Sequence, residues 1–250
     1  MIKLCISGAG GKMGSAIINC CKSDGDVEIG GLLEKGGSPA AGKVLEGIKV
    51  LTGIEDAVKN CDCLIEFTNS QATLEHLAKI SIPAVVGTTA FSEEQIKKIG
   101  EFSKKIPVVL SPNMSKGVNL LFSLSKTAAR KLPGYEVEII EAHHNRKKDA
   151  PSGTAKKIAE IINEDKNLKF VYGREGNVGA RKQEEIGIHA VRAGDIVGEH
   201  TVIFAGPGEC FELVHKAYSR NCFAQGAIAA AKWLVGKSPA LYTMSDVLGI

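Results

Sequence analysis

The chain begins with a short apolar run, residues 2–7, that ends in a glycine-rich turn with the spacing Gly8-x-x-Gly11-x-x-Gly14. A helical pattern, residues 15–22, follows this turn. Gly8 permits a tight turn, Gly11 allows backbone N–H groups to approach a pyrophosphate, and Gly14 allows the helix to pack against the strand. The positive end of the helix dipole favours phosphate charge at this point. This order of elements predicts a dinucleotide-binding fold that opens with a parallel β-α-β unit.

A second strand over Val27–Leu33 supports this prediction, because it ends in the pair Glu34-Lys35. An acidic residue about 20 positions after the glycine turn typically binds the ribose hydroxyls of a dinucleotide. Lys35 offers a cation for a 2′-phosphate, so we expect the cofactor to be NADH or NADPH. The alternative is a purely structural turn followed by a surface Glu-Lys pair.

The next part of the chain alternates strands and helices, which predicts a parallel sheet with helices on both faces. The expected strands are residues 63–67, 83–86 and 107–110, and the expected helices are residues 71–80 and 93–104. Ligands of such sheets bind beyond the carboxyl ends of the strands. We therefore expect residues 67–68, 87–89 and 111–114 to border the cofactor.

The pattern changes after a long predicted helix over residues 115–132. Four strands are expected at residues 135–142, 186–192, 198–204 and 209–216, with a single helix, Ala155–Ile162, and a polar stretch, residues 163–185, among them. This predicts a smaller α+β domain with a four-stranded mixed sheet. Because the helices are too few to cover both faces of that sheet, another subunit is the favoured cover.

The most chemically dense segment runs from Glu141 to Thr154 and lies between a predicted strand and a predicted helix. His143 can donate or accept a proton near neutral pH, and Lys147 is a cation suited to a carboxylate or phosphate. The turn Ser152-Gly-Thr154 precedes the helix, where backbone N–H groups form an anion site. The segment predicts a proton donor beside a binding site for negative charge. The alternative is a solvated loop with Ser152 or Thr154 as a plain helix N-cap.

Composition limits the classes of partner. The net charge is only +3, which does not imply a nucleic-acid surface, and no apolar run is long enough for a membrane span. We therefore expect no nucleic-acid or membrane partner and a small anionic molecule instead. Seven cysteines without a C-x-x-C pair indicate core residues in a reducing cytoplasm rather than a metal site. No N-terminal segment has the pattern of a signal peptide.

The chain resembles the 4-hydroxy-tetrahydrodipicolinate reductase (dihydrodipicolinate reductase) family. The resemblance rests on the loop Glu141–Thr154, on the turn Gly8–Gly14 and on the segments Gly87–Thr89, Asn113–Gly117 and His215–Ala217. It implies a Rossmann-type domain, residues 1–114, that is rejoined by the C-terminal tail, residues 223–250. It also implies a domain for substrate binding and homotetramer formation, residues 115–222.

The resemblance further implies roles for individual residues. His143 is the expected catalytic acid, assisted by Lys147. The positions expected to bind the substrate dicarboxylate are His144, Ser152, Gly153 and Thr154. The positions expected to bind the cofactor are Gly8, Ala9, Gly10, Gly11, Lys12, Met13, Glu34, Lys35, Gly87, Thr88, Thr89, Ser111, Pro112, Asn113 and Met114. No metal is expected. Lys35 stands where many members of the family carry arginine.

The implied reaction is NAD(P)H-dependent reduction of 4-hydroxy-tetrahydrodipicolinate in lysine and diaminopimelate biosynthesis, by hydride transfer and protonation. Two other hypotheses remain open on the residues alone. A different NAD(P)-dependent reductase, such as a homoserine or aspartate dehydrogenase, would keep the first domain and lack the paired histidines. A nucleotide-sensing regulatory protein would not need a proton donor beside an anion site.

Overall fold

The chain divides into two compact units in the computed structural model, which describes residues 1–164 and 166–250. The first unit comprises Met1–Lys116 with Arg220–Ile250, and the second comprises Gly117–Ser219. These boundaries lie two to three residues from the positions named from the sequence. Within the described residues, no helix is both long and apolar enough to cross a membrane.

An eight-stranded sheet forms the centre of the first unit, with the strand order β13-β7-β6-β5-β1-β2-β4-β3. Its pairings are parallel except for the β3–β4 pair. The strands are β1 (Ile2–Ser7), β2 (Val27–Leu33), β3 (Val44–Leu45), β4 (Ile48–Leu51), β5 (Cys63–Glu66), β6 (Ala84–Val86), β7 (Val108–Leu110) and β13 (Leu241–Tyr242). The parallel sheet confirms the Rossmann-type prediction.

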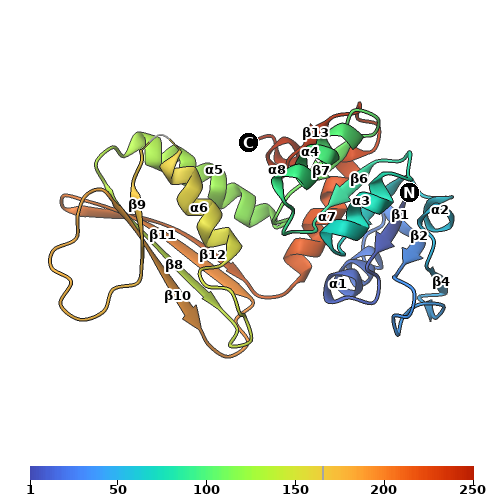
Figure 1. The fold of residues 1–250 in the computed structure, drawn as a ribbon, viewed down its shortest axis with the longest axis horizontal. Helices are drawn as coiled ribbons and strands as arrows, with labels where there is room; N and C mark the ends of the chain where they lie inside the picture. Colours follow the sequence, from blue (N-terminus) through green and yellow to red (C-terminus); the bar gives the residue numbers. More distant parts are fainter. Residues whose placement is uncertain (165) are drawn as a thin grey trace. The chain divides into compact units, whose positions relative to one another are not determined.

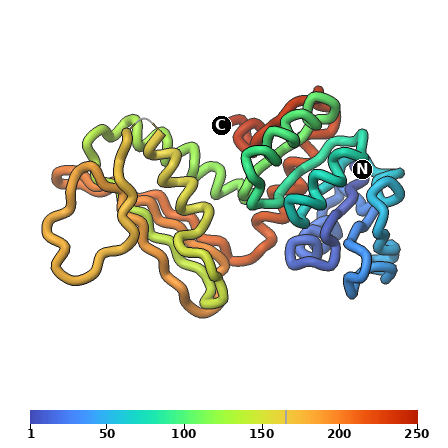
Figure 2. Tube along the Cα trace, viewed as in Figure 1, coloured from blue at the N-terminus to red at the C-terminus, as the bar shows by residue number. Residues whose placement is uncertain are grey.

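Helices cover both faces of this sheet, as Figure 1 shows. They are α1 (Lys12–Cys21), α2 (Ile54–Val58), α3 (Ser70–Leu77), α4 (Glu93–Phe102), α7 (Asn221–Leu234) and α8 (Met244–Leu248). Leu4 and Ile6 of β1 pack in one core with α1 and α7, whereas Cys5 packs in the other with α2, α3 and α4. Figure 2 traces the C-terminal segment, in red, back among the elements of this unit.

The second unit holds a five-stranded mixed sheet with the order β12-β11-β8-β10-β9. Its elements are α5 (Lys116–Lys131, which begins at the boundary), β8 (Glu136–His143), α6 (Gly153–Asn163), β9 (Lys169–Tyr172), β10 (Glu185–Arg192), β11 (Gly198–Gly206) and β12 (Glu209–Ala217). Strand β8 runs parallel to β10 and antiparallel to β11.

The predicted number of four strands in this sheet is therefore wrong, although its mixed pairing is confirmed. The additional strand, β9, lies in the stretch that the sequence marks as polar, and it pairs in parallel with β10 at the edge of the sheet. Its four residues are only partly buried or exposed, and Phe170 packs against the core. The run Phe170-Val-Tyr172 favours a strand, but it is short and its neighbours in the sequence are polar.

Helices cover one face of the five-stranded sheet. Val137 and Ile139 of β8 point to that face and pack with residues of α5 and α6, which Figure 1 shows lying together over the strands. Ile140, on the opposite face, is 39% exposed, and Val214 of β12 is 53% exposed. Within the part of the chain that the structure describes, one face of the sheet therefore has no helical cover.

Candidate active site

The glycine turn of the first unit has the shape that a dinucleotide requires. Gly8 has a φ of +80°, and a Cβ atom there would lie 2.5 Å from the carbonyl oxygen of Phe67. A Cβ atom on Gly14 would lie 2.2 Å from the carbonyl oxygen of Gly8, so only glycine allows α1 to pack this closely. Gly11 is the N-cap of α1 and supplies no side-chain cap. The first amides of α1 therefore face outward as an anion site.

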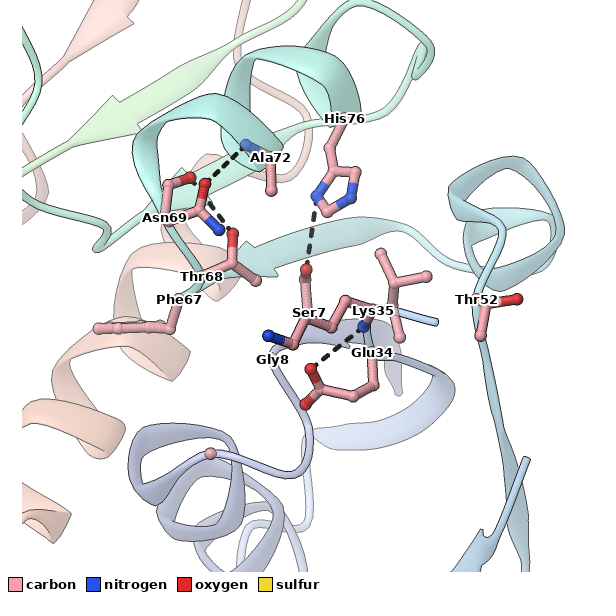
Figure 3. Close-up of a pocket in the computed structure, with 12 residues that line it drawn as sticks. Ser7, Gly8, Glu34, Lys35, Thr52, Phe67, Thr68, Asn69, Ala72 and His76 are labelled. Carbon is pink, nitrogen blue, oxygen red and sulfur yellow. Dashed lines mark hydrogen bonds between the residues drawn. The ribbon is translucent and has the colours of Figure 1, made fainter. Parts of the chain in front are cut away.

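A cavity of about 270 Å³ opens beside this turn, as Figure 3 shows. Glu34 and Lys35, at the end of β2, line it together with Gly8 and Gly11. The Glu34 carboxylate accepts hydrogen bonds from the backbone N–H of Gly10, at 3.0 Å, and of Lys35, at 3.1 Å. This carboxylate suits ribose hydroxyls, and the exposed Lys35 ammonium suits a 2′-phosphate. The residues present thus fit NADH or NADPH.

Another wall of the cavity carries a histidine that is hydrogen-bonded to a buried carboxylate, a pair that the sequence analysis did not single out. Glu66, at the end of β5, is fully buried, and its Oε2 atom lies 2.7 Å from Nδ1 of His76 on α3. The Thr68 hydroxyl donates to the other Glu66 oxygen, Oε1, and Ser7 Oγ lies 3.5 Å from His76 Nδ1. Ser7, Thr68 and His76 line the cavity (Figure 3). Ser7 and Thr68 lie at the carboxyl ends of β1 and β5, where ligands of parallel sheets bind, and His76 reaches the same cavity from α3.

The other residues predicted to bind the cofactor occupy three kinds of position. Gly87 and Thr88 contact the residues that line the cavity, because a Cβ atom on Gly87 would overlap the ring of Phe67, and the Thr88 hydroxyl accepts from the backbone N–H of Thr68. Thr88, Thr89 and Pro112 line a second cavity of about 240 Å³. Ser111 and Asn113 bond to one another in the turn after β7.

Four more of these residues belong to the glycine turn, to the start of α1 or to the core. Lys12 and Met13 are the first two residues of α1, and Ala9 is buried beneath the turn. Met114 is 2% exposed, and its carbonyl group packs against Gly226 of α7, so its side chain belongs to the hydrophobic core.

The predicted catalytic histidine lies at the end of β8 in the second unit. Glu141 and His143 are two residues apart on this strand, so their side chains point to the same face. The register sets Glu141 opposite His200 of β11, which in turn faces His215 of β12. The sheet thus aligns an acid and three imidazoles that are up to 74 residues apart in sequence.

Glu141 is fully buried and makes four hydrogen bonds as an acceptor. Its Oε2 atom lies 2.5 Å from His143 Nδ1, and the Arg192 guanidinium donates to both carboxylate oxygens at 2.7 and 2.9 Å. The backbone N–H of Ser152 donates to Oε1 at 3.0 Å. Burial alone would raise the pKa of Glu141, but the bonds from His143, Arg192 and Ser152 lower it to about 2. The carboxylate is therefore charged at neutral pH.

A second buried imidazole lies against His143. The rings of His143 and His200 meet edge to face, with their centroids 5.2 Å apart. Burial first, and the charge on His143 next, lower the pKa of His200 to about 3. Its Nε2 atom lies 3.1 Å from the Ser152 hydroxyl, and that hydroxyl accepts from the N–H of Ala155 as the N-cap of α6. His200 is therefore neutral and does not repel a protonated His143.

The remaining residues predicted to bind substrate belong to the loop between β8 and α6 or to the first turn of α6. Lys147 is 21% exposed and pairs with Asp149 at 2.9 Å, and its charge is among the causes that lower the pKa of His200. Gly153 and Thr154 are the first two residues of α6, where amides have no acceptor within the helix. His144 is half-buried and directly follows His143 in the chain. Ser152 is 2% exposed, so its hydroxyl acts as the helix N-cap that was the alternative interpretation.

The described residues contain no group of three or more His, Cys, Asp or Glu side chains that could hold a metal ion. In the row of Glu141, His143 and His200, Nδ1 of His143 lies within hydrogen-bond distance of the Glu141 carboxylate, and Nε2 of His200 lies within hydrogen-bond distance of the Ser152 hydroxyl.

Comparison with known proteins identifies the family. Residues 2–114 match the family described as dihydrodipicolinate reductase, N-terminus, and residues 117–248 match its C-terminus. The chain belongs to the dihydrodipicolinate reductase family. Among its relatives, 4-hydroxy-tetrahydrodipicolinate reductase of Aquifex aeolicus is 46% identical and that of Syntrophus aciditrophicus 45%, each covering 100% of this chain and 99% of the relative.

The fold agrees with this membership. A dipicolinate-bound dihydrodipicolinate reductase from Paenisporosarcina sp. TG-14 superposes with a TM-score of 0.79 at 26% identity, with 97% of each chain covered. The dihydrodipicolinate reductase family consists of NAD(P)H-dependent oxidoreductases, so the predictions of enzyme class and of cofactor are confirmed. The dehydrogenase and sensor hypotheses are excluded by the match of both halves of the chain.

Sequence reasoning missed the residues that hold the predicted ones in place. The sequence analysis gave Glu141 no role beyond marking the start of the histidine loop. It did not single out Arg192 or His200. The available signal was the two-residue spacing of Glu141 and His143, which places both on one face of a strand. The pairing of β8 with β10 and β11 brings Arg192 and His200 to the same face. No local sequence pattern predicts this pairing.

Proposed function

We propose that this dihydrodipicolinate reductase reduces 4-hydroxy-tetrahydrodipicolinate to tetrahydrodipicolinate in lysine and diaminopimelate biosynthesis, with His143 as the proton donor. The observation that carries the mechanism is the buried Glu141 that binds His143 at the end of β8, next to the N-terminus of α6. The substrate is a ring with two carboxylates and an imine, and a family member binds the related dicarboxylate dipicolinate.

The first unit binds and orients the cofactor, which supplies a hydride when bound. The amides at the start of α1 hold the pyrophosphate, and the Glu34 carboxylate accepts hydrogen bonds from the ribose hydroxyls. Lys35 pairs with the 2′-phosphate of NADPH, whereas NADH needs Glu34 alone. The chain therefore uses both cofactors.

The second unit holds the substrate carboxylates. Lys147 exchanges its Asp149 partner for one carboxylate, and the amides of Gly153 and Thr154 bind that charge at the start of α6, with His144 alongside. This fixes the ring relative to the proton donor, which is a positioning effect.

The chemistry then needs one proton. Loss of water from the ring hydroxyl leaves a carbon–carbon double bond conjugated with the imine. Addition of hydride to the far end of that system leaves an electron-rich ring carbon, which takes a proton from Nε2 of the protonated His143. The ring of His143 then regains its proton from solvent, so the reaction consumes one hydride and one proton and releases one water.

Two further properties follow from the same chain. We propose a homotetramer built on the open face of the five-stranded sheet, which is supported by the exposed Ile140, Val191 and Val214. All seven cysteines are free, which supports the reducing cytoplasm as its location. Sedimentation of the wild type and of Val214→Lys tests the assembly: the variant should sediment as a smaller species, and a monomeric wild type would contradict the proposal.

Oxidation of NADPH tests the function. The assay compares the enzyme with and without the condensation product of aspartate semialdehyde and pyruvate. Rapid oxidation that requires this product is the expected result. Oxidation that requires a different semialdehyde or keto acid would refute the substrate assignment.

A further inference from the structure

A fully buried acid of the second unit, Glu141, binds the proposed proton donor. Glu141 is 0% exposed, and each of its two carboxylate oxygens accepts two hydrogen bonds. Oε2 binds His143 Nδ1 and Arg192 Nη1, and Oε1 binds Arg192 Nη2 and the Ser152 amide. Burying a carboxylate costs desolvation free energy, and these four hydrogen bonds offset that cost for the charged form of Glu141.

The bond between Glu141 and His143 determines which ring nitrogen can react. A carboxylate can only accept a hydrogen bond, so Nδ1 of His143 must carry the hydrogen that lies between them. The atom left for exchange with a substrate is then Nε2. Gly198 keeps that side of the ring open, because a Cβ atom at this position would lie 3.1 Å from Nε2.

We propose that Glu141 is the positioning residue for proton transfer by His143: it holds the ring with a hydrogen on Nδ1, leaves Nε2 to deliver the proton, and is itself held by Arg192. This inference deepens the proposed function and rests on it, since it concerns the same proton transfer. The negative charge of Glu141 also stabilises the protonated ring that the reaction requires.

Arg192 connects this pair to the substrate-binding loop. Its guanidinium binds both oxygens of Glu141 in the planar geometry that fixes a carboxylate, and its Nη2 atom also donates to the backbone carbonyl of Asp149 at 2.6 Å. Asp149 in turn pairs with Lys147. A single side chain thus fixes both the acid that orients His143 and the loop that presents Lys147 to the substrate.

The charged and titratable groups near His143 indicate that Glu141 is its charged partner. They are Glu141 of β8, Arg192 of β10, His200 of β11, His215 of β12, and Lys147 and Asp149 of the loop before α6. His200 and His215 have pKa values lowered by burial and stay neutral. Arg192 and Lys147 are each paired with an acid. Among the residues that the structure describes, Glu141 places an anion in direct contact with the ring of His143.

The pH profile of kcat/KM for NADPH-dependent reduction tests this role in Glu141→Gln, which keeps the size of the side chain and removes its charge. Turnover falls at high pH once His143 has lost its proton. Because the variant lacks the negative charge that stabilises the protonated ring, the alkaline limb of the profile should move to lower pH by about one unit or more. We expect kcat to fall by at least about tenfold and KM to stay within about threefold. Glu141→Asp, which restores the charge, should return the limb towards its wild-type position.

Glu138→Gln is the matched control. Glu138 is on the same strand but on the opposite face, and it also binds a histidine and arginines, with His189 at 2.7 Å and Arg174 at 2.9 Å. Its loss should leave the position of the alkaline limb unchanged. A limb that stays in place in Glu141→Gln, or that moves equally in Glu138→Gln, would overturn the positioning role.

A second measurement needs no turnover. The Nδ1 hydrogen of His143, bonded to a buried carboxylate, should give a downfield proton resonance in ring-15N-labelled enzyme. It should be present in the wild type and Glu138→Gln and absent in His143→Gln and Glu141→Gln. Its absence from the wild type would overturn the inference even if reduction occurs. Its presence in an enzyme that does not reduce the substrate would refute the proposed function alone.

Discussion

Replacing Glu141 by glutamine should make the stability of the protein less dependent on acid pH. The ordinary pKa of a glutamate is 4.5, and the bonds to Glu141 lower it to about 2 in the folded chain. A group whose pKa is lowered by folding adds stability above its unfolded pKa, and this stability is lost as the pH falls towards the folded value. The relevant window therefore runs from about pH 4.5 down to pH 2.

The size of the effect follows from the shift. Each pKa unit corresponds to about 1.4 kcal/mol, so the bonds to the charged form of Glu141 contribute about 3 kcal/mol, of which about 2 kcal/mol is lost by pH 3. Glutamine does not titrate. The free energy of unfolding should thus fall by about 2 kcal/mol more in the wild type than in Glu141→Gln between pH 7 and pH 3.

Urea unfolding followed by circular dichroism at the two pH values measures this difference. Glu101→Gln is the control, because Glu101 forms an exposed pair with Lys104 and such pairs contribute little to stability. This control should lose as much stability as the wild type. Equal losses in the wild type and in Glu141→Gln would refute the reasoning that the buried network holds Glu141 in its charged form.

Three further outcomes follow from the two sites. Lys35→Ala should raise the Kd of NADPH far more than that of NADH, measured by titration of each cofactor, and equal losses would refute a 2′-phosphate contact. Gly8→Ala should lower the free energy of unfolding by about 1–3 kcal/mol, because of its φ of +80° and the approach to Phe67, whereas Gly25→Ala, where a Cβ atom meets nothing within 4 Å, should be neutral. Lys147→Ala should lower kcat and raise KM in steady-state assays, and an unchanged KM would exclude a contact with the substrate carboxylate.

Local sequence patterns predicted the elements that are determined by interactions between residues close in sequence. Val27–Leu33 is a strand over the residues expected, because its apolar run is bounded by polar residues on both sides. Ser92 and Gln95 form the capping box that opens α4, as their spacing indicates. The glycine spacing predicted the turn after β1 because positive φ and close packing leave few other choices.

The pairing of distant strands was not predictable in the same way. Strand β9 contains the β-favouring residues Phe170, Val171 and Tyr172, but it has only four residues and lies within a stretch that is polar on both sides. The meeting of Glu141 with Arg192 and His200 depends on the register of three strands. Register is set by the whole core on the helix-covered face, so a buried polar network on that face is visible only once the fold is known.

The measurement that bears most directly on the account is the steady-state reduction of the substrate by His143→Gln. The glutamine side chain keeps a polar group at the end of β8 but cannot serve as a general acid. The account predicts that kcat falls by about 10²- to 10⁴-fold while KM changes little. Turnover near that of the wild type would contradict the assignment of His143 as the proton donor.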